Sequence, residues 1–180
     1  MRIYLGHGAA GSAATMEPWI AGLRDRGLEA HALTLPRGTA ERAIAAFEAQ
    51  VPDGDDVVVG GHSFGGRVAS LSAAGVVGDG SARRPRRYRA LVCLSYPLHR
   101  PGAPETAGAR TAHWPRLALP ALLLSGTRDP FARLDLLEAA LPMLPQGRLV
   151  RYERRGHALL PVRELVLDEV AAFLRSMGDT

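Results

Sequence analysis

Hydrophobic residues along this chain gather in short runs, and longer stretches with helical spacing separate these runs. Two runs, Val57-Val58-Val59 and Leu122-Leu123-Leu124, are apolar at every position, which is typical of strands buried on both faces. We predict strands at residues 2–5, 29–33, 56–60, 88–94, 121–125 and 148–152, and helices at residues 15–26, 40–49, 64–75, 131–141 and 161–177. This alternation predicts an α/β fold, in which helices cover both faces of a doubly wound, mostly parallel, six-stranded sheet.

Two segments interrupt the alternation. Residues 76–87 form a loop rich in glycine and arginine, and the arginines continue to Arg89. We interpret this loop as a solvated surface segment, with an anionic partner as the alternative. Residues 96–119 form the longest stretch without a strand, and they follow a strand end. In an open parallel sheet that end is the edge where ligands bind.

Composition narrows the class of protein further. The 180 residues are 47% hydrophobic and 22% charged, which predicts one folded domain over residues 1–180. The single cysteine, Cys93, excludes an internal disulfide framework and a four-cysteine zinc site. All 22 basic residues are arginine and the net charge is +4. We interpret this as a compositional bias of the source genome rather than as a sign of nucleic-acid binding. With no 18-residue apolar run and no room for a signal peptide, the sequence predicts a cytoplasmic protein without membrane partners.

The sequence Gly61-His62-Ser63-Phe64-Gly65 directly follows the third predicted strand and opens onto a helix. It fits the G-x-S-x-G pattern, in which a nucleophilic serine occupies a strained strand-to-helix turn. Side chains in place of Gly61 and Gly65 would collide at so tight a turn. Ser63 is therefore the candidate nucleophile, and His62 is expected to point away from the site and to be structural. The alternative is an ordinary glycine-rich turn with an incidental serine.

A serine hydroxyl needs a base to take its proton, and chain order suggests one. Asp129 comes just after the fifth predicted strand, and His157 comes just after the sixth. The carboxyl ends of parallel strands meet at one edge of a sheet, so both residues are expected near Ser63. The order Ser63, Asp129, His157 is the order of a serine triad on this architecture, with His157 as general base and Asp129 holding its ring. Taken singly, His157 could be an ordinary loop residue and Asp129 a helix cap.

Two backbone N–H groups are expected to bind the oxyanion of the tetrahedral intermediate. One is that of Phe64, the residue after the nucleophile, and the other comes from the loop after the first strand. Ala9 is the predicted second donor, with Ala10 as the alternative, and His7 is expected to orient or pack this loop. Each such donor contributes about 3 kcal/mol of transition-state stabilisation.

The same loop supports a competing interpretation. The sequence Gly6-His7-Gly8-Ala9-Ala10-Gly11 matches G-x-G-x-x-G after a strand, the fingerprint of dinucleotide binding. That fingerprint requires an acidic residue at the end of the second strand to hold the ribose. Here the strand ends in Leu33-Thr34-Leu35-Pro36, with no carboxylate, and Glu29 lies at its start. The nicotinamide interpretation is therefore weak, and we expect neither a cofactor nor a metal.

These motifs together resemble the α/β-hydrolase superfamily over nearly the whole chain. Residues 7–11, 65–70, 96–102 and 126–131 are similar, more narrowly, to a family of small hydrolases that includes the hydrolase-like domain of nonspecific-lethal-complex subunits, and the chain also resembles dienelactone hydrolases. The resemblance implies a serine triad of Ser63, Asp129 and His157. The chain is expected to depart from the full fold of the superfamily in two ways, since it begins at the strand before the oxyanion loop, without the usual antiparallel hairpin, and residues 96–119 are too few for a cap domain.

A lidless site is expected to lie in a shallow, open cleft. We expect Tyr96, Leu98, His99 and Arg100 to form its rim, with Arg100 as a candidate to bind a substrate carboxylate. The predicted function is a serine esterase that cleaves a small ester or thioester through an acyl-enzyme, with a small-molecule substrate and no nucleic-acid partner. The alternative is a catalytically idle binding module that uses the hydrolase fold as a scaffold.

Overall fold

The computed structural model describes residues 1–178 and contains one six-stranded sheet in the order β2-β1-β3-β4-β5-β6. Every neighbouring pair of strands runs parallel, so the predicted α/β fold with a doubly wound sheet is confirmed. The strands are β1 (Arg2–Gly6), β2 (Glu29–Leu33), β3 (Val57–His62), β4 (Ala90–Leu94), β5 (Ala121–Gly126) and β6 (Gly147–Tyr152). The helices are α1 (Glu17–Asp25), α2 (Ala40–Glu48), α3 (Phe64–Ala73), α4 (Ala107–Thr111), α5 (Leu134–Ala140) and α6 (Arg163–Arg175).

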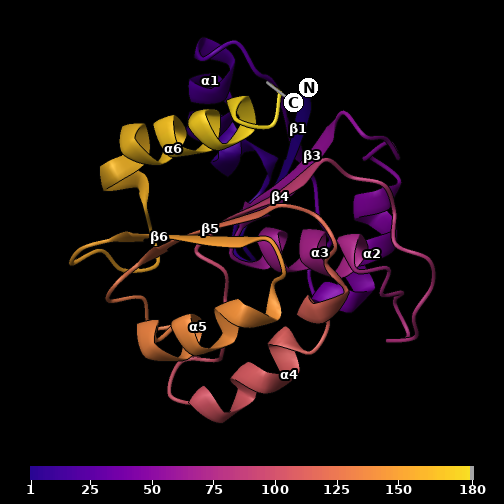
Figure 1. Cartoon of the computed structure of the whole chain (residues 1–180), viewed down its shortest axis with the longest axis vertical. Helices are drawn as coiled ribbons and strands as arrows, with labels where there is room; N and C mark the ends of the chain where they lie inside the picture. Colours follow the sequence, from indigo (N-terminus) through magenta and orange to yellow (C-terminus); the bar gives the residue numbers. More distant parts are fainter. Residues whose placement is uncertain (179–180) are drawn as a thin grey trace.

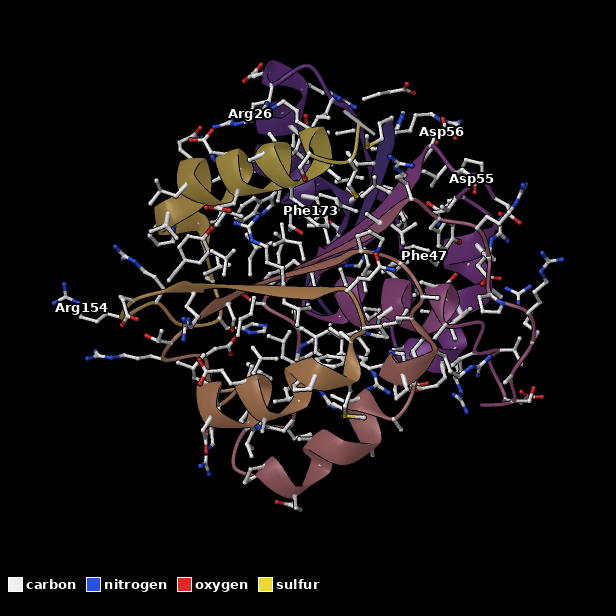
Figure 2. All side chains as sticks on the ribbon, viewed as in Figure 1. Arg26, Phe47, Asp55, Asp56, Arg154 and Phe173 are labelled. Atoms are coloured by element: carbon white, nitrogen blue, oxygen red, sulfur yellow. The ribbon has the colours of Figure 1, made fainter. Side chains whose placement is uncertain are left out.

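The helices form two layers, one on each face of the sheet. Figure 1 shows α1 and α6 together on one face, and α2, α3 and α5 on the other, with α4 beyond them. The two hydrophobic cores follow this division: Phe47 of α2 belongs to one and Phe173 of α6 to the other. Charged side chains such as Arg26, Asp56 and Arg154 lie at the periphery (Figure 2).

The continuous apolar runs of the central strands are explained by this arrangement. In β3, Val57 and Val59 pack into the core beneath α2 and α3, whereas Val58 packs into the core beneath α1 and α6. Leu123 and Leu122 of β5 divide in the same way. Successive side chains of a strand point to opposite faces, so a strand buried between two helical layers needs an apolar residue at every position.

Helix α5 begins at Leu134, three residues later than the sequence pattern predicts. The Phe131 N–H donates to the Asp129 carboxylate at 2.8 Å, and the Arg133 N–H donates to Nε2 of His99 at 3.0 Å. These side-chain acceptors hold the segment before Leu134 as a turn. Because α5 begins only at Leu134, residues 127–133 form a loop after β5, and this loop carries Asp129.

The segment of residues 96–119 folds back onto the protein as short helical pieces. It contains α4 and two 3-10 turns, Pro104–Thr106 and Trp114–Arg116, and Trp114 and Leu117 are buried in the core. In the arginine-rich loop, Arg83 and Arg86 pair with Glu48, and Arg87 pairs with Asp53. Over residues 1–178, no helix has the length and apolar character needed to cross a bilayer.

Candidate active site

Ser63 occupies the turn between β3 and α3, with φ 49° and ψ −112°. A residue other than glycine rarely adopts a positive φ, and such a conformation costs on the order of 1–3 kcal/mol. The Ser63 N–H donates to the Leu94 carbonyl oxygen at 2.9 Å, and the Arg67 N–H donates to the Ser63 carbonyl oxygen at 3.1 Å. The turn is thereby tied to both β4 and α3, and these bonds compensate the strained conformation.

The two glycines of the motif are required by the end of β1. A Cβ atom on Gly61 would lie 2.3 Å from the carbonyl oxygen of Gly6, and one on Gly65 would lie 2.2 Å from the same atom. Gly61 also has φ +153°, which disfavours any side chain there. The close backbone approach brings the loop after β1 beside the nucleophile turn.

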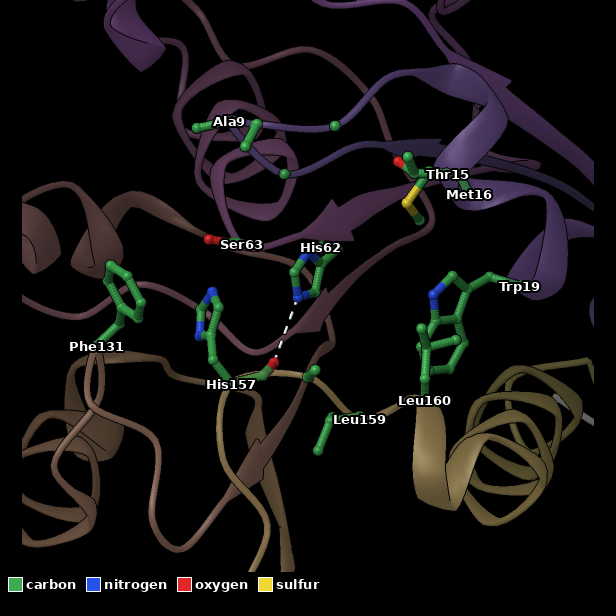
Figure 3. Close-up of a pocket in the computed structure, with 14 residues that line it drawn as sticks. Ala9, Thr15, Met16, Trp19, His62, Ser63, Phe131, His157, Leu159 and Leu160 are labelled. Atoms are coloured by element: carbon green, nitrogen blue, oxygen red, sulfur yellow. Dashed lines mark hydrogen bonds between the residues drawn. The ribbon is translucent and has the colours of Figure 1, made fainter.

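Asp129 and His157 meet at the carboxyl edge of the sheet. His157 Nδ1 lies 2.9 and 2.8 Å from the two carboxylate oxygens of Asp129, whose side chain is fully buried. Nδ1 therefore donates to the carboxylate, which leaves Nε2 free on the other side of the ring. In Figure 3 this ring extends towards the Ser63 hydroxyl. The Phe131 ring packs against the His157 ring, with 4.4 Å between centroids.

The ring of His157 and the hydroxyl of Ser63 line one cavity without a direct bond. Among the described residues, no hydrogen bond joins Ser63 to His157, although both border the same cavity of about 450 Å³. Catalytic hydrogen bonds in ligand-free enzymes are often long and shorten only when substrate binds. The arrangement is therefore compatible with proton transfer between these two residues.

His7 fixes the loop that contains Ala9. It is buried, its Nε2 accepts the Leu35 N–H at 3.1 Å, and its Nδ1 consequently donates to the Gly8 carbonyl oxygen at 2.7 Å. The same Gly8 oxygen accepts the Gly11 N–H at 2.9 Å. These bonds rigidify the turn beside Ser63, the orienting role expected for His7. The Phe64 N–H lies in the first turn of α3, where helix geometry provides no backbone acceptor.

Two cavities flank Ser63, and we name them the apolar and the cationic cavity. The apolar cavity is that of about 450 Å³, with Met16, Trp19, Leu159 and Leu160 on its walls. The cationic cavity, of about 620 Å³, has charged side chains on its walls: Glu41, Arg67, Arg100 and Arg110. Ser63, Ala9 and Phe131 line both cavities.

The expectation that His62 points away from the site is wrong. Its side chain lines the apolar cavity, its ring centroid is 5.1 Å from that of His157, and its Nε2 lies 3.3 Å from the His157 carbonyl oxygen. Burial, reinforced by the neighbouring His157, lowers the pKa of His62. A neutral His62 with a proton on Nε2 donates to that carbonyl and so helps to hold the His157 loop (Figure 3).

Three of the four predicted rim residues are also wrong. Tyr96, Leu98 and His99 are 1%, 0% and 2% exposed, so they cannot contact a substrate. The Tyr96 hydroxyl donates to the Arg110 carbonyl oxygen at 2.7 Å, and Leu98 packs in the core. His99 donates through Nδ1 to the Arg100 carbonyl oxygen at 2.8 Å, because its Nε2 accepts from Arg133. Of the predicted four, Arg100 alone is exposed, and it lines the cationic cavity.

Several lining residues were missed by the sequence analysis. Arg67 lies one helical turn after Ser63, and that spacing places both residues on one side of α3. This signal was available in the sequence. Glu41 and Arg110 come from α2 and α4, and their approach to Ser63 depends on how those helices pack, for which the sequence carries no local signal.

A second serine–histidine pair exists, but it is inaccessible. His113 Nε2 lies 2.9 Å from Ser70 Oγ, and both residues are buried. The Ser70 hydroxyl donates to the Arg67 carbonyl oxygen at 2.8 Å, so His113 is the donor in the pair and no proton is offered to a base. Burial, with a further contribution from Arg67, lowers the pKa of His113 to about 3. Ser70 is therefore a structural serine.

Residues 1–178 bring no three histidine, cysteine, aspartate or glutamate side chains together as a possible metal site.

Comparison with known proteins agrees with this fold. A profile of the alpha/beta hydrolase domain matches residues 3–171. The fold is similar to that of Paleococcus ferrophilus monoacylglycerol lipase, with a TM-score of 0.75 and 14% identity over 96% of this chain and 94% of the other. It is also similar to Thermogutta terrifontis esterase 2 phosphonylated by cyclosarin, with a TM-score of 0.79 and 17% identity over 98% and 83% of the chains. No curated protein sequence matches the chain.

Proposed function

The chain belongs to the alpha/beta hydrolase domain family, and from this premise we propose that it is a serine hydrolase that cleaves a small ester or thioester through an acyl-enzyme. The observation that carries the proposal is the bond of His157 to the buried Asp129 beside the strained Ser63. Similarity to a lipase and an esterase of low identity establishes the fold and not the substrate.

In the proposed reaction, His157 Nε2 takes the proton of Ser63 as Oγ forms a bond to the substrate carbonyl carbon. The electron pair of the carbonyl moves to its oxygen, and the N–H groups of Phe64 and Ala9 bind the resulting oxyanion. Collapse of this intermediate breaks the bond to the leaving alcohol or thiol, which receives the proton from His157. Water then attacks the acyl-enzyme in the same manner and releases the acid.

Asp129 contributes through its burial and its bonds. Its side chain is 0% exposed, and it accepts both from His157 and from the Phe131 N–H. A carboxylate held in this way fixes the orientation of the imidazole ring and compensates the positive charge that develops on it. The helix-cap alternative considered for Asp129 is not realised, because α5 begins at Leu134 with Arg133 at its N-cap and the bond from Phe131 lies in the preceding turn.

The size and openness of the two cavities support a small substrate. Their volumes of about 450 and 620 Å³ lie within the range of small-molecule sites, and no separate cap covers them in residues 1–178. Leu160, at the wall of the apolar cavity, is 52% exposed. A long apolar group of a substrate that extends past this wall would therefore remain largely in water.

A fluorophosphonate probe tests the proposal. The wild-type protein is expected to be labelled once, and Ser63→Ala is expected to abolish both labelling and hydrolysis of a panel of acetyl to hexanoyl esters. Ser70→Ala is the matched control, because Ser70 is a buried serine on α3, and it is expected to be labelled like the wild type. Absence of wild-type labelling, or labelling that survives Ser63→Ala, contradicts the proposal. An unlabelled protein that binds a partner equally well with Ser63→Ala would instead be the idle binding module.

A further inference from the structure

The walls of the cationic cavity carry more positive than negative charge. Arg67, Arg100 and Arg110 contribute three guanidinium groups, and Glu41 is the one acidic residue among the described residues that line it. The carboxylate of Glu41 binds Arg67 at 2.5 Å. Within the described part of the chain, Arg100 and Arg110 have no carboxylate within ion-pair distance. Two cations beside the nucleophile are thus left without a counter-charge.

The arginines are held by contacts that leave part of their bonding capacity unused. Arg110 donates through Nη1 to the Pro97 carbonyl oxygen at 2.8 Å, which anchors its half-buried side chain at the wall. Nη1 of Arg67 is buried without a hydrogen-bond partner among the described residues. Burial, followed by the positive charges of Arg67 and Arg100, lowers the pKa of Arg110. An uncompensated cationic cluster of this kind is stabilised when an anion enters it.

The position of His157 decides which part of a substrate enters this cavity. His157 lines the apolar cavity and is not among the residues of the cationic one, whereas Phe64, the expected oxyanion donor, lines the cationic cavity. The general acid must reach the leaving oxygen, so the leaving group belongs on the side of His157. The acyl group then extends from Ser63 into the cationic cavity.

We propose that the preferred substrates are esters or thioesters whose acyl group ends in an oxyanion, a carboxylate or a phosphate, which Arg100 and Arg110 bind while an apolar leaving group occupies the cavity beside Trp19. This rests on the proposed hydrolase function and specifies its substrate class. Guanidinium groups bind both oxyanions through paired N–H donors, so the two share one recognition chemistry.

Two matched esters test the preference. Mono-4-nitrophenyl adipate and 4-nitrophenyl hexanoate have the same acyl length and leaving group, and they differ only in the terminal carboxylate. The ratio of their kcat/KM values, corrected for background with Ser63→Ala, is expected to be about 10 in favour of the adipate. Arg100→Gln and Arg110→Gln are each expected to lower this ratio several-fold. Arg175→Gln, an equal loss of charge on an exposed side chain of α6, is expected to leave it unchanged.

The outcomes separate this proposal from the one on which it rests. Equal kcat/KM values for the two esters, or a preference that survives the Arg100→Gln/Arg110→Gln double variant, overturn the anion site while the hydrolase function stands. A greater gain from a carboxylate placed on the leaving group, as in 4-carboxyphenyl hexanoate against phenyl hexanoate, overturns the assignment of the acyl group. Inhibition of hexanoate cleavage by inorganic phosphate but not by adipate assigns the oxyanion as phosphate.

If neither ester is cleaved, the proposed hydrolase function is wrong. The anion site can then still be tested by measuring ligand binding. Calorimetry with Ser63→Ala is then expected to show tighter binding of monoethyl adipate than of ethyl hexanoate, with the difference reduced by Arg100→Gln. Equal binding of the two ligands overturns the anion site as well.

Discussion

The two cavities beside Ser63 differ because they extend from opposite faces of the sheet. The apolar cavity continues the core beneath α1 and α6, since Met16, Trp19 and Leu159 belong to that core and also line the cavity. The walls of the cationic cavity come from the sides of α2, α3 and the segment around α4, where Glu41, Arg67 and Arg110 reach the surface. Ser63, at the sheet edge, thus lies between two chemically different halves of the site, of which Figure 3 shows the apolar one.

The largest effect is expected from a change at Asp129, because the His157 that it holds would serve substrates in either half of the site. Asp129→Asn removes the charge that orients and compensates His157, so kcat is expected to fall by about 10³–10⁴. Because the change lies outside both cavities, the acidic and the neutral ester are expected to lose the same factor. Steady-state kinetics with the matched esters checks this. Unequal losses would mean that Asp129 also contributes to the charge of one cavity.

Burial of His113, with a smaller contribution from Arg67 of the cationic cavity, makes its protonation unfavourable in the folded protein. Its pKa of about 3 lies below the ordinary value of 6.5, so the unfolded chain binds a proton at this residue at pH values where the folded chain does not. Its contribution to stability is complete above pH 6.5 and is lost as the pH falls towards 3. His113→Gln is expected to reduce the fall in the free energy of unfolding between pH 6.5 and pH 4 by about 3 kcal/mol. Urea unfolding of both proteins at the two pH values measures this difference. A fall that is undiminished in His113→Gln would mean that protonation of His113 does not cause it.

Leu160 tests the apolar half without disturbing the core. Its side chain is 52% exposed, so Leu160→Ser is expected to leave the fold intact while removing apolar contact with the leaving group. We expect kcat/KM to fall about threefold to tenfold for 4-nitrophenyl hexanoate, with the ratio between acidic and neutral esters unchanged. Leu165→Ser is the control, because Leu165 is 59% exposed on α6 and does not line the cavity. A similar loss in both variants would assign the effect to general surface change.

The residues at strand ends could be predicted from the sequence, whereas most residues of the cavity walls could not. The strands, the glycine-flanked turn and the positions of Asp129 and His157 after strand ends follow from local patterns, because a buried strand and a tight turn impose their own residue types. Tyr96, Leu98 and His99 were misassigned because they follow a strand end, yet their side chains turn inward to the core. Glu41 and Arg110 meet only through the packing of helices distant in sequence, which no local pattern encodes.

The smallest effect is expected from a change at Glu41, the acidic residue at the wall of the cationic cavity. Burial works to raise the pKa of Glu41, but hydrogen bonds from its own backbone and from Arg67 outweigh this and lower it, so the residue is charged at neutral pH. Glu41→Gln keeps the size of the side chain and removes a negative charge from the cavity wall, which is expected to increase the preference for the adipate ester about twofold to threefold. The matched-ester ratio measures the change, and Glu138→Gln, on α5 and bound to Arg151, is the control for net charge. A decrease in the ratio would mean that Arg67 needs its partner Glu41 to hold the cavity wall in place, and an unchanged ratio would mean that the charge of Glu41 does not act on the anion bound by Arg100 and Arg110.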